Sequence, residues 1–336
     1  MTPRQLKYFV EIARTGSITT AASTLHIAQP ALSHHISGME EELGVVLLER
    51  HARGVRLTPE GQRLLDRAVS ILRQLDRLND DVRDASTQAR GTVSLCLVGS
   101  VAQVMTVPLF RLLAERAPEV RLQVSTGMSR EARALVEARR VDLALLPVAY
   151  ELPRLESVPA FEERFCLFGL DFLFEGECGP IRFAEIGDRP LVAPDRDHDL
   201  RKLIERTAMA HNCALNVQYE LNNPELYRRV VQEGLAFAIM PRNAFADAEA
   251  LGVVARDIIE PGIERTQSVV WMVDHPLTPA GEVVRTALLD VIAMLIADGT
   301  LKARDAGHPG DGRPGRVVAR ATVDPHPLRA IGKRHS

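Results

Sequence analysis

The stretch AQPALSHHISGMEEELG, residues 28–44, has the pattern of a helix with two unlike faces. Apolar side chains recur every three or four residues, as in a helical stripe that packs against a core: Leu32, Ile36, Met39 and Leu43. Neutral small or polar residues occupy the opposite face: Gln29, Pro30, Ser33 and His34. Glutamine and serine can hydrogen-bond base edges in a DNA major groove, and a helix N-terminus favours phosphate oxygens. We therefore expect this helix to contact DNA, the alternative being an ordinary three-helix domain with a polar surface.

Two shorter segments before this helix complete a helix-turn-helix pattern. Residues 4–15 carry apolar side chains at helical spacing, and Gly16 can end that helix. Ser17 can cap a short second helix in ITTAASTL, residues 18–25, where Ala21 and Ala22 allow another helix to approach closely. The tight turn HIA, residues 26–28, then leads into the third helix, which predicts that its polar face enters a major groove.

The segment after the third helix predicts a wing. Basic and acidic residues balance over residues 1–60, so only their placement can create a basic surface. Three arginines gather in ERHARGVRLT, residues 49–58, where an Arg-Gly turn and the alternating Val55 and Leu57 indicate a hairpin. Arg53 would lie at its tip and reach a phosphate or a minor groove. An ion pair within the wing is the alternative role for Arg50.

Residues 4–67 resemble the winged helix-turn-helix of LysR-type transcriptional regulators. The shared pattern comprises the paired alanines at 21–22, QPALS at 29–33, the ELG at 42–44, and the Arg-Gly turn before LTPEG at 57–61. Within the family, the segments LKYFV and LHIAQPALS look most like nitrogen assimilation control and cyn-type members. Ala28, His34 and His35 depart from the residues that many members carry there. The resemblance implies a homodimer or homotetramer on double-stranded operator DNA, with RNA polymerase as a further candidate partner.

Thr58 and Pro59 can begin a long helix that we expect to run to about residue 86. Its apolar residues form a seam at three- and four-residue steps: Leu65, Ala68, Leu72 and Leu75. The seam either packs on its own domain or pairs two copies of the chain, as the family resemblance implies. Residues 86–91, STQARG, are then expected to form a hinge.

Residues 91–300 alternate strand-like and helix-like segments, which predicts an α/β body with a parallel sheet. The segment SVVWMV, residues 268–273, would return to the first half of the body, giving two lobes with a cleft between them. The resemblance implies the two-lobed effector domain, similar to periplasmic binding proteins.

The chain as a whole is therefore expected to be α/β, with a winged helix-turn-helix (1–60), a linker helix and hinge (61–90), an effector domain (91–300) and a disordered basic tail (301–336). Lobe I would comprise residues 91–162 and 268–300, and lobe II residues 163–267.

Polar side chains follow several of the expected strands, where small ligands bind in open α/β sheets. The candidate effector-binding residues are Ser100, Thr126, Ser129, Asp195, His198 and Asn222. Hydroxyl groups beside helix N-termini would suit an anionic effector. Ser100 and Ser129 can instead cap helices, and His198 can cap a helix or pair with Asp195 or Asp199. Asp195 would disfavour a carboxylate beside it.

Other classes of function find no support in the sequence. We find no catalytic motif, no metal-ligand spacing and no nucleotide-binding loop, so we expect no enzyme activity, metal or cofactor. The four cysteines form no CxxC pair, which favours a reducing compartment. The start of the chain has no leader pattern, and no apolar run reaches about 18 residues, so we expect a cytoplasmic protein that does not enter a membrane.

The preferred function is a transcription regulator that responds to a small molecule of nitrogen or organic-acid metabolism. A cytoplasmic small-molecule-binding protein and an effector-independent regulator remain alternatives.

Overall fold

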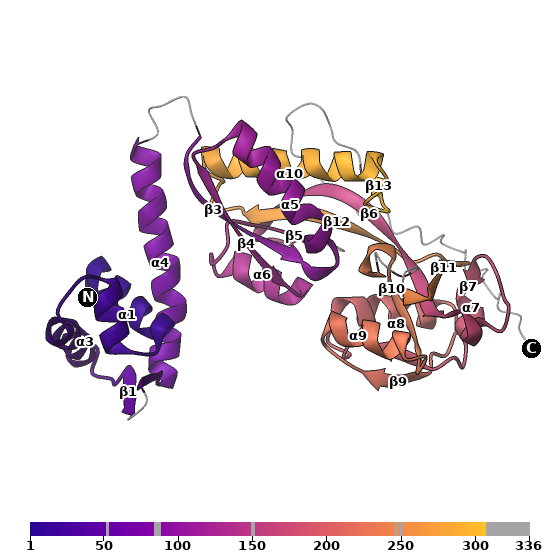
Figure 1. Ribbon diagram of the computed structural model, residues 1–336, viewed down its shortest axis with the longest axis horizontal. Coiled ribbons are helices and arrows are strands. Elements are labelled where there is room, and N and C mark those ends of the chain that lie inside the picture. The colour runs from indigo at the N-terminus through magenta and orange to yellow at the C-terminus, as the bar shows by residue number, and fades with distance from the viewer. Residues whose placement is uncertain (52–53, 84–88, 149–151, 246–247, 249–250, 307–336) are drawn as a thin grey trace, which may run out of the picture.

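The computed structural model describes residues 1–51, 54–83, 89–148, 152–245, 248 and 251–306. A small helical domain with a hairpin comes first, a long helix leads away from it, and two α/β lobes follow (Figure 1). No described helix is both long and apolar enough to cross a membrane. Arg53 and residues 307–336 of the expected tail lie outside the described residues.

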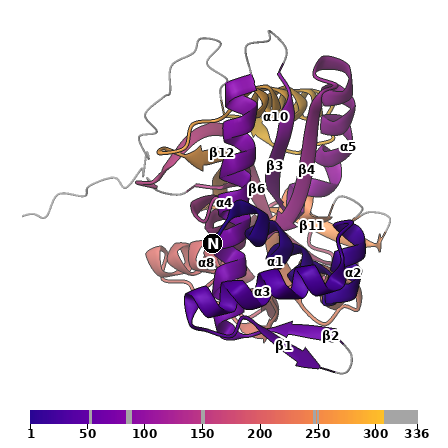
Figure 2. The ribbon, with the colours of Figure 1, turned by 90° about the vertical axis from the view of Figure 1, so that its left-hand side faces the viewer.

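The N-terminal domain packs its helices around one apolar core (Figure 2). It contains α1 (Pro3–Thr15), α2 (Ile18–Thr24), α3 (Gln29–Leu43), β1 (Leu48–His51), β2 (Gly54–Leu57) and the first half of α4 (Pro59–Arg83). Thr2 and Ser17 cap α1 and α2, and Gly16 ends α1 in the left-handed conformation. Leu32, Ile36 and Met39 of α3 are fully buried, each contributing about 1.5–3 kcal/mol. The last residue expected in this stripe, Leu43, is instead 41% exposed because α3 ends there.

The start of α4 is fixed tightly to the segment that precedes the wing. The Thr58 hydroxyl donates to Val46 O at 2.7 Å and accepts from Gly61 N at 2.9 Å. A Cβ on Gly61 would lie 2.1 Å from Leu47 O, so this close approach requires glycine. Residues 61–72 therefore belong to the N-terminal core, where Ala68 is fully buried, rather than to a separate linker.

Lobe I is built from β3 (Gly91–Val98), α5 (Gly99–Arg116), β4 (Val120–Gly127), α6 (Ser129–Glu137), β5 (Leu143–Pro147) and α10 (Pro279–Ala297). β3 pairs in parallel with β4 and β5, as the alternating pattern predicts. α5 and α10 cover one face of this sheet, and α6 lies on the other (Figure 1). Asp142, before β5, accepts from the backbone and the hydroxyl of Ser94 and so fixes the register of β5 against β3.

Two long strands cross between the lobes and make the sheet mixed rather than wholly parallel. They are β6 (Leu155–Leu170) and β12 (Glu264–Met272), which pair antiparallel with each other. β12 begins before residue 268, so that residues 264–267 already pair with β6 in the lobe I sheet. At this crossing, the fully buried carboxylate of Glu163 accepts hydrogen bonds from Arg265 and Gln267.

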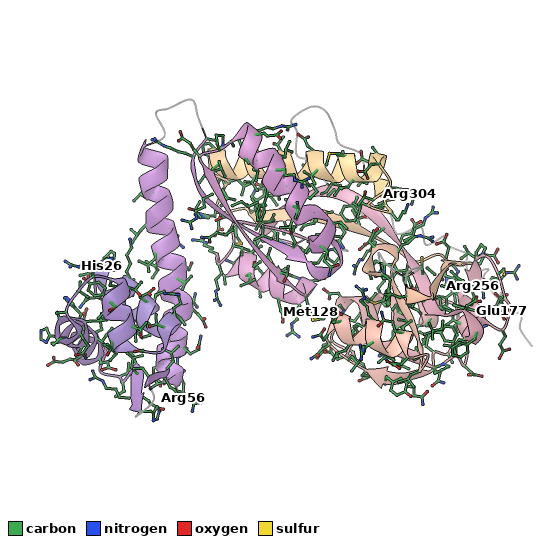
Figure 3. The ribbon with its side chains drawn as sticks, in the orientation of Figure 1. His26, Arg56, Met128, Glu177, Arg256 and Arg304 are labelled. Carbon is green, nitrogen blue, oxygen red and sulfur yellow. The ribbon has the colours of Figure 1, made fainter. Side chains whose placement is uncertain are left out.

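Lobe II has its own core around the second half of β6. Its elements are η1 (Asp171–Phe174), β7 (Ile181–Arg182), α7 (Phe183–Ile186), β8 (Leu191–Ala193), α8 (Asp199–Ala210), β9 (Val217–Glu220), α9 (Pro224–Gln232), β10 (Phe237–Pro241), η2 (Arg242–Phe245) and β11 (Val253–Ile259). The strand order is β6-β10-β8-β9, with β11 also paired to β6. Buried Arg256 donates to Glu177 at 2.6 Å and closes the outer loop of this lobe (Figure 3).

Residues 301–305, which the sequence assigned to the tail, lie on the body in the structure. Leu301 is 1% exposed and joins the lobe I core. A short strand, β13 (Arg304–Asp305), then pairs with β6 at Phe161 and Glu162. Residues 301–305 are thus part of the body, because one apolar anchor and a neighbouring strand edge hold them.

Candidate nucleic-acid interface and effector-binding residues

The outward face of α3 carries the residues that the sequence assigned to DNA contact. Gln29, Pro30 and His34 are exposed, and Ser33 is half-buried. Gln29 Nε2 donates to Ser33 Oγ at 3.0 Å, so the two side chains point along the same face one turn apart. Of the two adjacent histidines, His35 lies against the ring of Tyr8 with centroids 5.2 Å apart. His34 is therefore the histidine that faces solvent.

The N-terminal turn of α3 has no side-chain cap. Ala28 is the N-cap residue, and no side-chain oxygen accepts from the first backbone N–H groups. By contrast, α1 and α2 are capped by hydroxyls. Uncapped N–H groups and the positive end of the helix dipole together favour an anion such as a phosphate. The helix thus presents neutral hydrogen-bonding side chains beside an open anion-favouring terminus.

The wing is a two-stranded hairpin anchored to the end of α1. Leu48 pairs with Leu57, and Glu49 with Arg56, across β1 and β2. Arg56 is exposed on β2, the strand of the wing that follows its turn (Figure 3). The hairpin and α3 belong to one packed domain, which fixes the wing relative to the outward face of α3 (Figure 2).

The lobe I candidates for effector binding gather at the carboxyl ends of β3 and β4. Ser100 lies in the first turn of α5, Thr126 is exposed near the end of β4, and Ser129 is the first residue of α6. The N-cap residues are Val98 and Met128, so neither serine occupies the N-cap position of its helix. Because β3 and β4 are adjacent and parallel, these positions share one end of lobe I.

The α6 terminus is already occupied by a carboxylate that the sequence reading missed. Glu131 Oε2 accepts from Met128 N at 3.0 Å. Met128 lies at the edge of lobe I nearest lobe II (Figure 3). An anion at the N-terminus of α6 would have to displace Glu131 or bind beside its negative charge. The N-terminus of α5 has no side-chain cap and is therefore the better of the two sites for an anion. A glutamate three residues into a helix is the sequence signal for such a contact.

The lobe II candidates lie after the adjacent parallel strands β8 and β9. Asp195 Oδ1 accepts from Asp197 N at 3.1 Å, which shapes the loop before α8. His198 Nδ1 accepts from Leu200 N at 3.1 Å, so His198 does cap α8. Asn222 follows β9 and directly precedes Asn223, the N-cap of α9.

Burial and the nearby charge of Arg265 lower the pKa of His198, and they outweigh the opposing effect of Asp199 and Asp195. Arg265 belongs to the crossing strand β12, so its influence places the α8 terminus near the interlobe crossing. Sequence reasoning missed Arg265, since a charged residue that alternates with others at the start of a strand looks like a solvated one. Because Nδ1 of His198 accepts from Leu200 N, the neutral imidazole carries its proton on Nε2, which can donate a hydrogen bond.

Two family models match almost the whole described chain. Residues 3–62 match the bacterial regulatory helix-turn-helix protein model of the LysR family. Residues 86–293 match the LysR substrate binding domain. The chain therefore belongs to the LysR family of transcriptional regulators, which bind DNA and respond to small molecules.

Individual relatives extend over the same regions. The nitrogen assimilation regulatory protein nac of Klebsiella aerogenes is 29% identical over 300 residues, covering 87% of this chain and 96% of the relative. A full-length OxyR variant from Pseudomonas aeruginosa superposes with a TM-score of 0.66 at 21% identity, covering 92% of this chain and 99% of that chain. Full-length CbnR in complex with its target DNA also gives a TM-score of 0.66, at 20% identity, covering 88% and 99% of the two chains. These structures share the fold of this chain.

Proposed function

We propose that this LysR-family regulator reads its operator with Gln29, Pro30, Ser33 and His34 in the major groove, while Arg53 contacts the backbone or the minor groove beside it. The observation that carries this proposal is the neutral, exposed face of α3 next to an uncapped helix N-terminus. The first-turn N–H groups would hold a phosphate and set the register, and the Gln29–Ser33 pair would exchange its mutual hydrogen bond for base edges.

The same proposal includes pairing of two copies through α4, as a homodimer or as half of a homotetramer. Ile71 and Leu78 of α4 are 40% and 57% exposed, which is unusual for large apolar side chains at helical spacing. Pairing would cover them and present two α3 helices to a two-fold operator. RNA polymerase is a further proposed partner, and the cytoplasm is the compartment in which we place this activity.

For the effector, we propose a small anion that binds Ser100, Thr126 and Ser129 of lobe I and Asp195, His198 and Asn222 of lobe II. Support comes from their common location at strand ends and from the uncapped N-terminus of α5. Asp195 and Glu131 favour an effector with a hydrogen-bond donor in addition to its negative charge. The name of the nac relative points to nitrogen metabolism, and organic acids are the second candidate class.

Selection of DNA from a random pool by the full-length protein tests the DNA-binding part. The selected sequences should converge on a two-fold motif, and Ser33→Ala should weaken binding to it with an unchanged fold. Ser70→Ala, which removes the same hydroxyl from α4, is the matched control. Failure of the pool to converge, or equal affinity of both variants for the motif, would refute this assignment of α3. Thermal unfolding of wild type and Thr126→Ala with a panel of organic acids separately tests the effector site.

A further inference from the structure

The segment after α10, residues 299–305, runs from the core of lobe I towards lobe II, and we name it the strap. Asp298 ends α10, and its carboxylate accepts from Thr300 N at 2.8 Å. Gly299 adopts a left-handed conformation, with φ of +75°, that turns the chain back. Leu301 then enters the lobe I core, and its N–H donates to Leu295 O at 2.8 Å. The strap is thus firmly attached to lobe I at its start.

Asn243 of lobe II holds the next residue of the strap by two hydrogen bonds. Its Oδ1 accepts from Lys302 N at 2.8 Å, and its Nδ2 donates to Lys302 O at 3.2 Å. The Asn243 amide therefore satisfies both backbone groups of one residue, as a paired strand would. Asn243 is only 8% exposed, so losing this pair would leave buried polar groups without partners.

The element that carries Asn243 is fixed within lobe II. Asn243 belongs to η2, and Phe245 of the same turn stacks on Phe168 with ring centroids 4.4 Å apart. Phe168 and Phe245 are both members of the lobe II core. The two cores are therefore connected over a short distance. Leu301 of the lobe I core is followed by Lys302, which is hydrogen-bonded to Asn243, and Asn243 is two residues from Phe245 of the lobe II core.

The strap ends on the crossing strands themselves. Arg304 and Asp305 pair with Glu162 and Phe161 of β6. The Arg304 guanidinium lies 3.1 Å from Glu162 of β6 and 2.7 Å from Glu264 of β12 (Figure 3). These ion pairs are exposed and individually weak, but they place the strap across the two strands about which the lobes would rotate.

We propose that the strap is a latch that holds the two lobes in the orientation seen here, with the Asn243–Lys302 pair as its release point. Two crossing strands form a hinge that permits rotation, and the Asn243–Lys302 pair adds a third connection that restrains it. Opening the latch exposes Leu301 or breaks the Asn243 pair, so lobe rotation is coupled to order in residues 299–305. The strap lies beyond residue 293, where the match to the family's substrate-binding model ends.

Distances between the lobes of the full-length protein test the latch. Nitroxide labels are placed on the exposed native Cys178 of lobe II and on Glu115→Cys of α5 in lobe I, in a Cys213→Ser background diluted with unlabelled chain. The change to test is Asn243→Ala. Asn216→Ala is the control, because Asn216 makes a comparable bond from its amide to Asp188 O at 2.9 Å within lobe II alone.

The expected result is a broader or shifted interlobe distance distribution for Asn243→Ala and an unchanged one for Asn216→Ala. Amide hydrogen exchange at Lys302 should also rise by roughly tenfold, since its N–H loses the hydrogen bond to Asn243. If Asn243→Ala fails to fold, Asn243→Asp keeps the acceptor for Lys302 N and should give a smaller change of the same kind. A distribution for either folded variant that superimposes on that of the parent protein would overturn the proposal.

Discussion

The backbone N–H of Val55 on the wing donates a 2.8 Å hydrogen bond to the carbonyl oxygen of Gly16 at the end of α1. The neighbouring Gly54 has φ of +138°, and a Cβ there would lie 2.5 Å from the same carbonyl oxygen. The wing is therefore held to α1 through a contact that only glycine permits at position 54.

Gly54→Ala should loosen the wing and lower the free energy of unfolding by about 1–3 kcal/mol, because of backbone strain and a direct clash. Operator affinity should fall with it. Gly38→Ala is the control, since a Cβ at Gly38 in α3 meets no atom within 4 Å. That control should stabilise the protein by roughly 0.5–1 kcal/mol, as alanine is the better helix former. Equal unfolding midpoints for the two variants would contradict this view of the wing.

Arg53→Ala should lower affinity for all DNA sequences alike and reduce the salt dependence of binding, because it would remove the contact to the phosphate backbone that we propose for Arg53. Gln29→Ala should instead reduce the preference for the selected operator over unrelated DNA by about 1–3 kcal/mol. Fluorescence anisotropy at several salt concentrations distinguishes the two effects. A sequence-selective loss for Arg53→Ala would show that the wing reads bases.

His198 should make the body less stable in acid. Its pKa in the folded state lies below the ordinary value of 6.5, so the unfolded chain binds more protons between the two values. Stability therefore falls as the pH drops below about 6.5 towards the folded-state pKa. His198→Asn can keep the N-cap of α8 without titrating, and should reduce this loss in urea unfolding between pH 7.5 and 5.5. His198→Ala, without a cap, should be less stable throughout the range.

Glu163→Gln should be one of the most destabilising single changes in the chain. Glu163 is fully buried and its charge compensates Arg265, whose side chain is 13% exposed. Removing one partner of such a pair costs about 3–5 kcal/mol. The adjacent Glu162→Gln is the control: Glu162 is 41% exposed, and its pair with Arg304 contributes only about 0–1 kcal/mol. Similar urea midpoints for both variants would contradict the role given to the buried pair.

The four free cysteines should differ in how fast their thiols react. Burial and the hydrogen bond to Asp257 raise the pKa of Cys166 to about 12, which leaves little thiolate at pH 8. Cys96 is also buried, whereas Cys178 is exposed. An aromatic disulfide reagent at pH 8 should therefore modify Cys178 first, and Cys96 and Cys166 only after unfolding. Rapid reaction of Cys166 in the folded protein would contradict its buried environment.

Local patterns predicted most of the regular elements because each has a buried stripe or an apolar run bounded by turn residues. The α3 stripe and the strand at residues 120–127 are examples. The start of α5 at Gly99 is hard to predict from the sequence, because glycine is a weak signal for a helix start. The exposure of Gln29, Pro30 and His34 also agrees with their expected face, although DNA contact by them stays a prediction.

Features that depend on partners far along the chain escaped sequence reasoning. The backbone of Lys302 is hydrogen-bonded to Asn243, 59 residues away, and a lysine between a leucine and an alanine gives no sign of such a contact. Glu163 and Arg265 are likewise 102 residues apart, and each alone looks like an ordinary surface charge. Only the antiparallel register of β6 and β12 brings that pair together in the interior.

The contact between Gly61 and Leu47 gives the first turn of α4 almost no freedom against the wing. Because the next turns of α4 are packed into the same core, α3 and the first half of α4 form one rigid unit. A twist or tilt of this half of α4 would therefore carry α3 with it. In two copies paired on DNA, as we propose, the body could thus reset the spacing of the two α3 helices without any rearrangement inside the N-terminal domain.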